Sequence, residues 1–240
     1  MLEGVIEMKK LFIVVLVCFL CTPLFAQTGT AVGTAGAKPT SETPASPAMS
    51  ALQTAYALAK YGYENSSASS LICAAEIVAQ TQKQEMANKG AAKDETADAT
   101  KKTEKSAEYT AEKLLADGKK MAAGDKTVLA YAAAVEKALK GKTRGAVGGP
   151  RYQVDKVGAG GTITYTLAFE AGKLAEVLVC GDGDTDLDLY VFDQNNNLIV
   201  YDEGYSDDCY VSFVPRWTGN FYIVVKNRGR VYNRFQIATN

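Results

Sequence analysis

The hydrophobic pattern of this 240-residue chain changes its period once, at a glycine-rich break. Before residues 140–150, "KGKTRGAVGGP", apolar residues recur every three or four positions, which is typical of amphipathic helices. After the break they alternate with polar residues, which is typical of strands. The pattern therefore predicts a two-domain α+β protein, with a helical domain at 49–142, a glycine-rich linker at 143–150 and a β-sandwich at 151–240.

Four helices are expected before the break. The segments 51–64, 67–86, 107–124 and 126–141 each carry an apolar stripe at helical spacing. Gly62 is expected to end the first helix, and Asp125 to cap the fourth. Residues 83–108 are mostly Lys, Glu, Asp, Thr and Ala, which favours a solvated linker or a loose helix.

The first two helices have small residues at their expected crossing positions. In this respect the pair at 51–82 is weakly similar to a tetratricopeptide unit. No second copy of the pattern follows in the chain, and such repeats rarely stand alone.

Eight short strands are expected after the break. The alternating runs lie near 151–157, 162–169, 174–180, 185–192, 197–202, 208–215, 220–227 and 231–238. Turn sequences such as "GAGG", "QNNN" and "WTGN" separate them. This succession predicts an eight-stranded antiparallel sandwich of jelly-roll type.

The first residues have the composition of a targeting segment. Two lysines, an apolar run from Leu11 to Leu20 and a small residue at Ala26 predict a secretory signal peptide at 1–26. Residues 27–48 are Ala, Gly, Thr, Ser and Pro with little to bury, which predicts a disordered linker. No later segment has the apolar length of a membrane span, so we expect an exported protein, periplasmic or secreted.

The chain contains no histidine. That excludes Ser/His/Asp and Cys/His nucleophile pairs and imidazole-bound zinc or haem. The net charge of −1 provides no electrostatic reason to expect nucleic acid as a partner. Cys180 and Cys209 lie at the end of one expected strand and the start of another, so a disulfide between them is predicted, with two buried thiols as the alternative.

Several segments of the sandwich carry a family resemblance. They are "VCGDGDTDLDLYVFDQNNNLIVYD", "SDDCYVSFVP", "WTGNFYIVVKN" and "GRVYNRFQIAT". Through them residues 174–240, and more weakly 151–173, resemble the bacterial pre-peptidase C-terminal domain, a β-sandwich usually appended to secreted enzymes. The resemblance implies binding to matrix or polymer substrates, and calcium binding as in some members. In this chain a helical segment stands where that family usually has a catalytic domain.

Aspartates occupy every second position from 182 to 188. Nine acids and no lysine or arginine lie between Gly181 and Pro215, so the segment needs counter-charge from elsewhere. Crowded carboxylates are the ligands that Ca²⁺ prefers, which makes Ca²⁺ the candidate cofactor. The predicted ligands are Asp182, Asp184, Asp186, Asp188 and Asp208. The alternatives are solvation, or cross-strand pairing with the basic residues after Cys209, which are Arg216, Lys226, Arg228, Arg230 and Arg234.

The sandwich segment is also rich in aromatic residues, some of which are expected to fill the core and turn corners. Those of outward parity are alternatively a platform for sugar rings or peptide side chains. The aromatic residues of the segment, of both parities, are Tyr190, Phe192, Tyr201, Tyr205, Tyr210, Trp217, Tyr222 and Tyr232.

Together these patterns favour a non-catalytic exported protein. Its sandwich is expected to bind an envelope or extracellular partner, either a polymer or a protein. One alternative is a structural envelope component whose helices oligomerise. The other is a glycoside hydrolase that uses a carboxylate pair such as Asp186 and Asp208.

Overall fold

The computed structural model describes residues 37–39, 44–81, 84–86, 90–93, 108–141 and 149–240. The predicted signal peptide at 1–26 and most of the predicted linker at 143–150 lie outside these residues. None of the helices among the described residues has the length and apolar character needed to cross a bilayer.

The four predicted helices are confirmed. They are α1 (Pro47–Glu64), α2 (Ala68–Thr81), α3 (Ala111–Met121) and α4 (Lys126–Gly141). At the start of α1 the Oγ of Ser46 accepts the N–H of Met49 at 3.4 Å, and Pro47 lies in the first turn, where its missing N–H costs nothing. Asp125 caps α4 as predicted, because its Oδ1 accepts the N–H groups of Thr127 and Val128.

Gly62 does not end α1, contrary to the prediction. It is buried inside the helix, and a Cβ atom at this position would lie 2.6 Å from Cδ2 of Leu71 in α2. Gly118 plays the same part in α3, where a Cβ would lie 2.7 Å from Cγ1 of Ile72. Glycine lowers helix propensity, but here it lets the backbones of neighbouring helices approach closely.

The eight predicted strands are also confirmed. They are β4 (Arg151–Val157), β5 (Thr162–Phe169), β6 (Ala175–Gly181), β7 (Leu187–Phe192), β8 (Leu198–Asp202), β9 (Asp208–Pro215), β10 (Gly219–Asn227) and β11 (Asn233–Thr239). One sheet contains β9-β6-β11-β4 in that order, and the other contains β5-β10-β7-β8. All their pairings are antiparallel, and the two orders are those of a jelly roll.

Three further short strands extend the sheets at their edges. They are β1 (Ala37–Pro39) beside β9, β2 (Gln84–Glu85) beside β4 and β3 (Ala91–Lys93) beside β5. β1 comes from the predicted disordered linker, and β2 and β3 from the predicted solvated linker. Met86, expected at the end of the second helix, is instead buried in the sandwich core. Sheet edges have unpaired N–H and C=O groups, which these weakly patterned segments satisfy.

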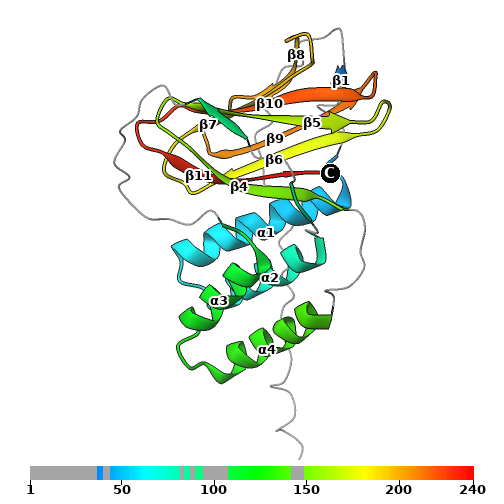
Figure 1. The fold of residues 1–240 in the computed structure, drawn as a ribbon. Coiled ribbons are helices and arrows are strands. Elements are labelled where there is room, and N and C mark those ends of the chain that lie inside the picture. Colours follow the sequence, from blue (N-terminus) through cyan, green and yellow to red (C-terminus); the bar gives the residue numbers. More distant parts are fainter. Residues whose placement is uncertain (1–36, 40–43, 82–83, 87–89, 94–107, 142–148) are drawn as a thin grey trace, which may run out of the picture.

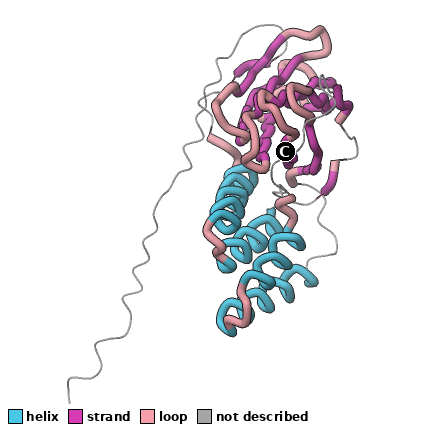
Figure 2. The backbone as a smooth tube through the Cα atoms, turned by 90° about the vertical axis from the view of Figure 1, so that its left-hand side faces the viewer, coloured by secondary structure: helices cyan, strands magenta, loops and turns pink. Residues whose placement is uncertain are grey.

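Two apolar cores stabilise the molecule. The first lies between the sheets and contains the rings of Phe213, Phe221 and Phe235. The second lies between the six-stranded sheet and the helices, where α1 is the helix closest to the sheet (Figure 1). Leu178 of β6 and Tyr56 of α1 both belong to this second core. The helices therefore form a layer stacked on one side of the sandwich (Figure 2).

Candidate functional site

The aspartates singled out in the sequence gather at one end of the sandwich. The β6–β7 connection lies beside the β8–β9 loop, because Gly181 N donates to Asp207 O at 2.8 Å and Leu187 N donates to Ser206 O at 3.1 Å. We call the resulting group the acidic edge; it comprises Asp182, Asp184, Asp186, Asp188, Asp202, Asp207 and Asp208.

Two of these carboxylates hold the backbone of the edge in place. Asp182 accepts the N–H of Arg234 at 3.0 Å and that of Asp184 at 3.2 Å. Asp207 accepts the N–H of Gly183 and the side-chain amide of Asn233. Both aspartates are buried, so these hydrogen bonds satisfy groups that water cannot reach.

Among the described residues, the helical part supplies counter-charge to the edge. Lys60 of α1 places its Nζ 2.9 Å from Oδ1 of Asp207 and 2.6 Å from Oδ1 of Asp208. Burial would lower the pKa of Lys60, but the neighbouring carboxylates of Asp208 and Asp207 raise it above its ordinary value. Of the basic residues after Cys209, Arg228 supplies a cross-strand partner, with its Nε 3.3 Å from Oδ2 of Asp188.

Three acids of the edge, Asp186, Asp188 and Asp202, resist ionisation. Burial raises the pKa of Asp186, and the nearby charge of Asp188 adds to the effect. Burial also raises the pKa of Asp188 and of Asp202, although both accept hydrogen bonds. Asp188 accepts one from the hydroxyl of Tyr190 at 3.0 Å, and Asp202 accepts one from the N–H of Tyr210 at 3.0 Å. Burial and like charges together therefore make these three carboxyl groups costly to ionise.

The predicted calcium ligands do not form a ready coordination sphere. Among the residues that the structure describes, no three acidic or thiol side chains are placed to share a metal ion. Asp182 is turned to backbone N–H groups, and Asp208 is ion-paired with Lys60. Calcium binding by Asp182, Asp184, Asp186, Asp188 and Asp208 therefore stays a prediction.

The predicted disulfide is absent, since Cys180 and Cys209 are both free thiols. The register places Cys180 opposite Asp208, and Val179 opposite Cys209. The two cysteines thus differ by one position in the pairing, and their side chains point to opposite faces of the sheet. Cys209 is buried between the sheets and Cys180 under the helices, as the alternative of two buried thiols requires.

The helices cover the outer face of the six-stranded sheet, which we call the covered face. Gln236 is 0% exposed there; its Oε1 accepts the N–H of Tyr109 at 2.8 Å, and its Nε2 donates to the hydroxyl of Tyr56 at 2.7 Å. Glu176 is equally buried, and accepts the hydroxyl of Tyr210 and the N–H of Ser46 at the start of α1. Gln236 and Glu176 thus each accept or donate at least one hydrogen bond in or beside a helix.

The outer face of the five-stranded sheet lies on the side away from the helices (Figure 1). It presents four half-buried rings, Tyr190, Phe192, Tyr201 and Tyr222, which we call the aromatic face. The ring of Tyr190 stacks beside that of Phe192 with 6.3 Å between centroids, and beside that of Tyr201 with 6.2 Å. Four of the aromatic residues therefore lie on outward-facing strand positions and form the platform that was the alternative expected from the sequence.

A shallow groove of about 330 Å³ crosses this face. Its lining residues are Thr164, Phe192, Asn196, Tyr222 and Val224. Phe192 and Tyr222 contribute rings, and Thr164 and Asn196 contribute a hydroxyl and an amide group beside them. The other aromatic residues have different places: Tyr210 faces the helices, Trp217 stacks on core residue Phe221, and Tyr205 is fully exposed on a loop.

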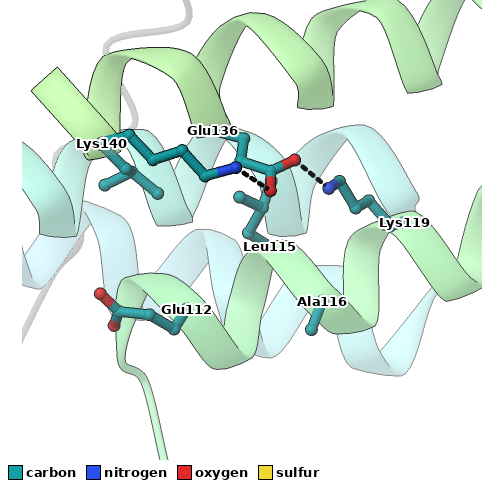
Figure 3. A pocket seen from close by; sticks show the side chains of 7 residues that line it. Glu112, Leu115, Ala116, Lys119, Glu136 and Lys140 are labelled. Carbon is teal, nitrogen blue, oxygen red and sulfur yellow. Dashed lines mark hydrogen bonds and ion pairs between the residues drawn. The ribbon is translucent and has the colours of Figure 1, made fainter.

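A second groove, of about 360 Å³, lies between α3 and α4 (Figure 3). Leu115 and Leu139 are among its apolar lining residues. Glu136 lies between Lys119 and Lys140 and pairs with both, and hydrogen bonds from these lysines lower its pKa. Glu112 also lines the groove, so two lysines and two glutamates leave it without net charge.

Sequence reasoning missed the residues that join the two parts, Lys60, Tyr56, Tyr109 and Gln236. One signal was present in the strand pattern. The run "AEVLVCG" of β6 is buried at all seven positions, whereas β10 alternates buried and half-buried residues over most of its length. A strand without alternation is typical of a sheet covered on both faces.

No protein-family model matches this chain, and no curated protein matches it. Solved structures that resemble it include a periplasmic inhibitor of g-type lysozyme from Aeromonas hydrophila, with 18% identity, 38% of this chain and 84% of that chain covered, and a TM-score of 0.30. The pre-peptidase C-terminal domain of a Bacillus anthracis collagenase has 15% identity, 37% and 88% coverage and a TM-score of 0.29. The C-terminal carbohydrate-binding module of the laminarinase LamC from Zobellia galactanivorans has 15% identity, 37% and 87% coverage and a TM-score of 0.25.

Proposed function

We propose that this chain is a non-catalytic binding protein that acts outside the cytoplasm and holds an envelope or extracellular partner, a polymer or a protein, on its aromatic face. One observation carries the proposal. The sandwich has two outer faces, and the helices occupy one of them while the other presents a group of half-buried rings. Aromatic side chains supply large contact areas at low entropic cost, which suits them to recognition.

The acidic edge is better suited to holding the fold together than to catalysis. A glycosidase needs two carboxylates facing a substrate cleft, one of them protonated and the other free to act. Asp208, one member of the suggested pair, is held by Lys60 at 2.6 Å. No acid of the edge lines the groove on the aromatic face or the grooves between the helices.

Hydroxyl-radical footprinting of the purified chain tests the proposal without assuming the class of the partner. The chain is labelled alone and after binding to insoluble envelope or extracellular matrix material. We expect protection of Phe192 and Tyr222 on the aromatic face. Tyr205 is the matched control, because it is fully exposed on a loop outside this face and should be labelled equally in both states.

Two results would overturn the proposal. One is the absence of any protection at Phe192 and Tyr222 under conditions in which the chain is retained by the material. The other is protection confined to Leu115 and Leu139 of the α3–α4 groove, which would favour a structural role in which the helices make the contacts.

A further inference from the structure

The strand register arranges the aromatic face in two neighbouring rows. In the first row Tyr201, Tyr190, Val224 and Thr164 lie opposite one another on β8, β7, β10 and β5. In the second row Phe192 pairs with Tyr222, and Tyr222 pairs with Thr166. Because neighbouring strands lie about 4.8 Å apart, a row across four strands spans about 14 Å. The surface is therefore long enough for an extended chain that crosses the strands.

Each row has aromatic rings on one side and a threonine hydroxyl at its β5 end. The rings lie on β7, β8 and β10, and the threonine hydroxyls lie on β5 next to them. Asn196, in the turn between β7 and β8, adds an exposed side-chain amide to the same groove. A ligand that fits this surface needs apolar patches to pack on rings and hydroxyl groups to hydrogen-bond beside them, and a sugar ring has both.

The charges around the aromatic face indicate which ligand charge it favours. Among the described residues of the two rows, none is charged. The next row contains Asp188 paired with Lys226, and Arg228 neutralises the same aspartate. Glu203 is exposed beside the first row, where it accepts the hydroxyl of Tyr190. An anionic polymer would meet the acidic edge at this end, whereas an uncharged chain meets no electrostatic cost.

The shape of the groove also favours a sugar chain over a protein partner. Protein partners concentrate their binding energy in anchors that enter fully desolvated pockets. The groove beside Phe192 and Tyr222 is shallow, both rings are half-buried, and the Phe192 ring already stacks beside that of Tyr190.

We infer that the aromatic face binds an uncharged polysaccharide, laid across β8, β7, β10 and β5 with its sugar rings against Phe192 and Tyr222. This inference rests on the proposed function, because it names the ligand class of the same face. Tyr190 is a positioning residue, since its hydroxyl is held by Asp188 and Glu203 and its ring supports the neighbouring rings.

Affinity electrophoresis of the whole chain tests the inference. The native gels contain either a neutral glycan (laminarin, hydroxyethyl cellulose or xylan), the anionic glycan alginate, or gelatin as a protein polymer. We expect at least one neutral glycan to retard the chain. Phe192→Ala and Tyr222→Ala should each weaken this retardation about tenfold, whereas Tyr222→Phe and the off-face control Tyr205→Ala should retain it. Circular dichroism and the melting temperature confirm that each variant is folded.

Thr164→Trp provides a second variant that leaves every ring in place. It fills the groove beside Phe192 and Tyr222 and should abolish neutral-glycan binding. The inference is overturned if no neutral glycan retards the chain, if alginate retards it more strongly, or if retardation survives both ring deletions. Retardation in gelatin alone that Tyr222→Ala abolishes would keep the aromatic face as a binding surface and reject the polysaccharide.

Discussion

The two outer faces of the sandwich are built by the same strand alternation, yet one is buried and the other meets solvent. On the covered face, Leu178, Cys180 and Tyr210 join the apolar core beneath α1. On the aromatic face, Tyr190, Phe192 and Tyr222 keep part of their surface exposed. The covered face pairs its buried polar groups with helix residues, whereas the aromatic face has rings and hydroxyls with space beside them.

This difference shows how one fold divides structure from recognition. The side chains of the covered face make internal contacts, so a substitution there should lower the free energy of unfolding. Few side chains of the aromatic face make such contacts, so a substitution there should mainly weaken partner binding. The acidic edge lies between the two faces and belongs with the covered one, because Lys60 of α1 supplies counter-charge to it.

The largest expected effect is a core deletion on the covered face. Leu178→Ala should lower the free energy of unfolding by about 2–5 kcal/mol, because it opens a cavity under the helices. Val224→Ala is the matched change on the aromatic face and should cost about 1 kcal/mol or less, because Val224 is only half-buried. Urea unfolding of both variants measures the difference; equal losses would mean that the helices do not cover this face in solution.

The next effect concerns the contact between α1 and the acidic edge. Lys60→Met should lower the free energy of unfolding by about 1–3 kcal/mol, less than for a fully buried pair, because the Lys60 side chain remains 20% exposed. Since the pKa of Lys60 is raised in the folded state, the stability it contributes is fully present below about pH 10.5 and is lost as the pH rises through the folded value.

Denaturation of wild type and Lys60→Met at several pH values checks this prediction. Lys113→Met is the matched control, because the ion-pair partner of Lys113 is Asp117 in the same helix and not an acid of the edge. A loss in Lys60→Met no greater than in Lys113→Met would indicate that the edge does not depend on the helices.

A smaller effect is expected from the repelling carboxylates of the edge. The raised pKa values of Asp186, Asp188 and Asp202 mean that the folded chain binds protons more readily than the unfolded chain does. The stability that these groups contribute should therefore rise as the pH falls through their folded pKa values toward the ordinary value. Asp186→Asn should stabilise the protein slightly at pH 7 and flatten this rise, as thermal unfolding between pH 7 and 4 can show. A steeper rise in the variant would contradict the assignment.

Calcium has the smallest expected effect, because no three of the described acidic side chains converge on one point. At a calcium concentration equal to Kd the stabilisation would be about 0.4 kcal/mol. Calorimetric titration of the whole chain, with Asp184→Asn as the control variant, measures binding directly. Absence of heat at millimolar calcium, together with a melting temperature unchanged by a chelator, would reject the predicted site.

The sequence alone predicted the elements well because both hydrophobic periods are strong. The apolar stripes placed four helices and the alternating runs placed eight strands, and six of the eight strand starts agree within one residue. The short strands were not predictable, since β1 and β3 have no apolar pattern and pair only because a sheet edge lies beside them. Met86 was likewise assigned to a helix, because local spacing cannot tell which of two cores a single apolar residue will enter.

The candidate site was only partly predictable, for a related reason. The sequence indicated that some of the eight aromatic residues lie on outward positions, because alternation is a local property of a strand. Parity did not show which outward face would be covered, and it did not show that Cys180 and Cys209 lie one register position apart. Those facts depend on strand pairing between distant segments.

The sequence by itself thus determined the two-part architecture, the strand alternation and the crowding of acids at one end of the sandwich, because each follows from neighbours in the chain. Only the tertiary structure decided that α1 packs on the outer face of the six-stranded sheet, that Lys60 neutralises Asp207 and Asp208, and that the aromatic rings line up in rows across β8, β7 and β10. Contacts between segments that are separated in the chain depend on which surfaces fit together, and that information is spread over the whole chain.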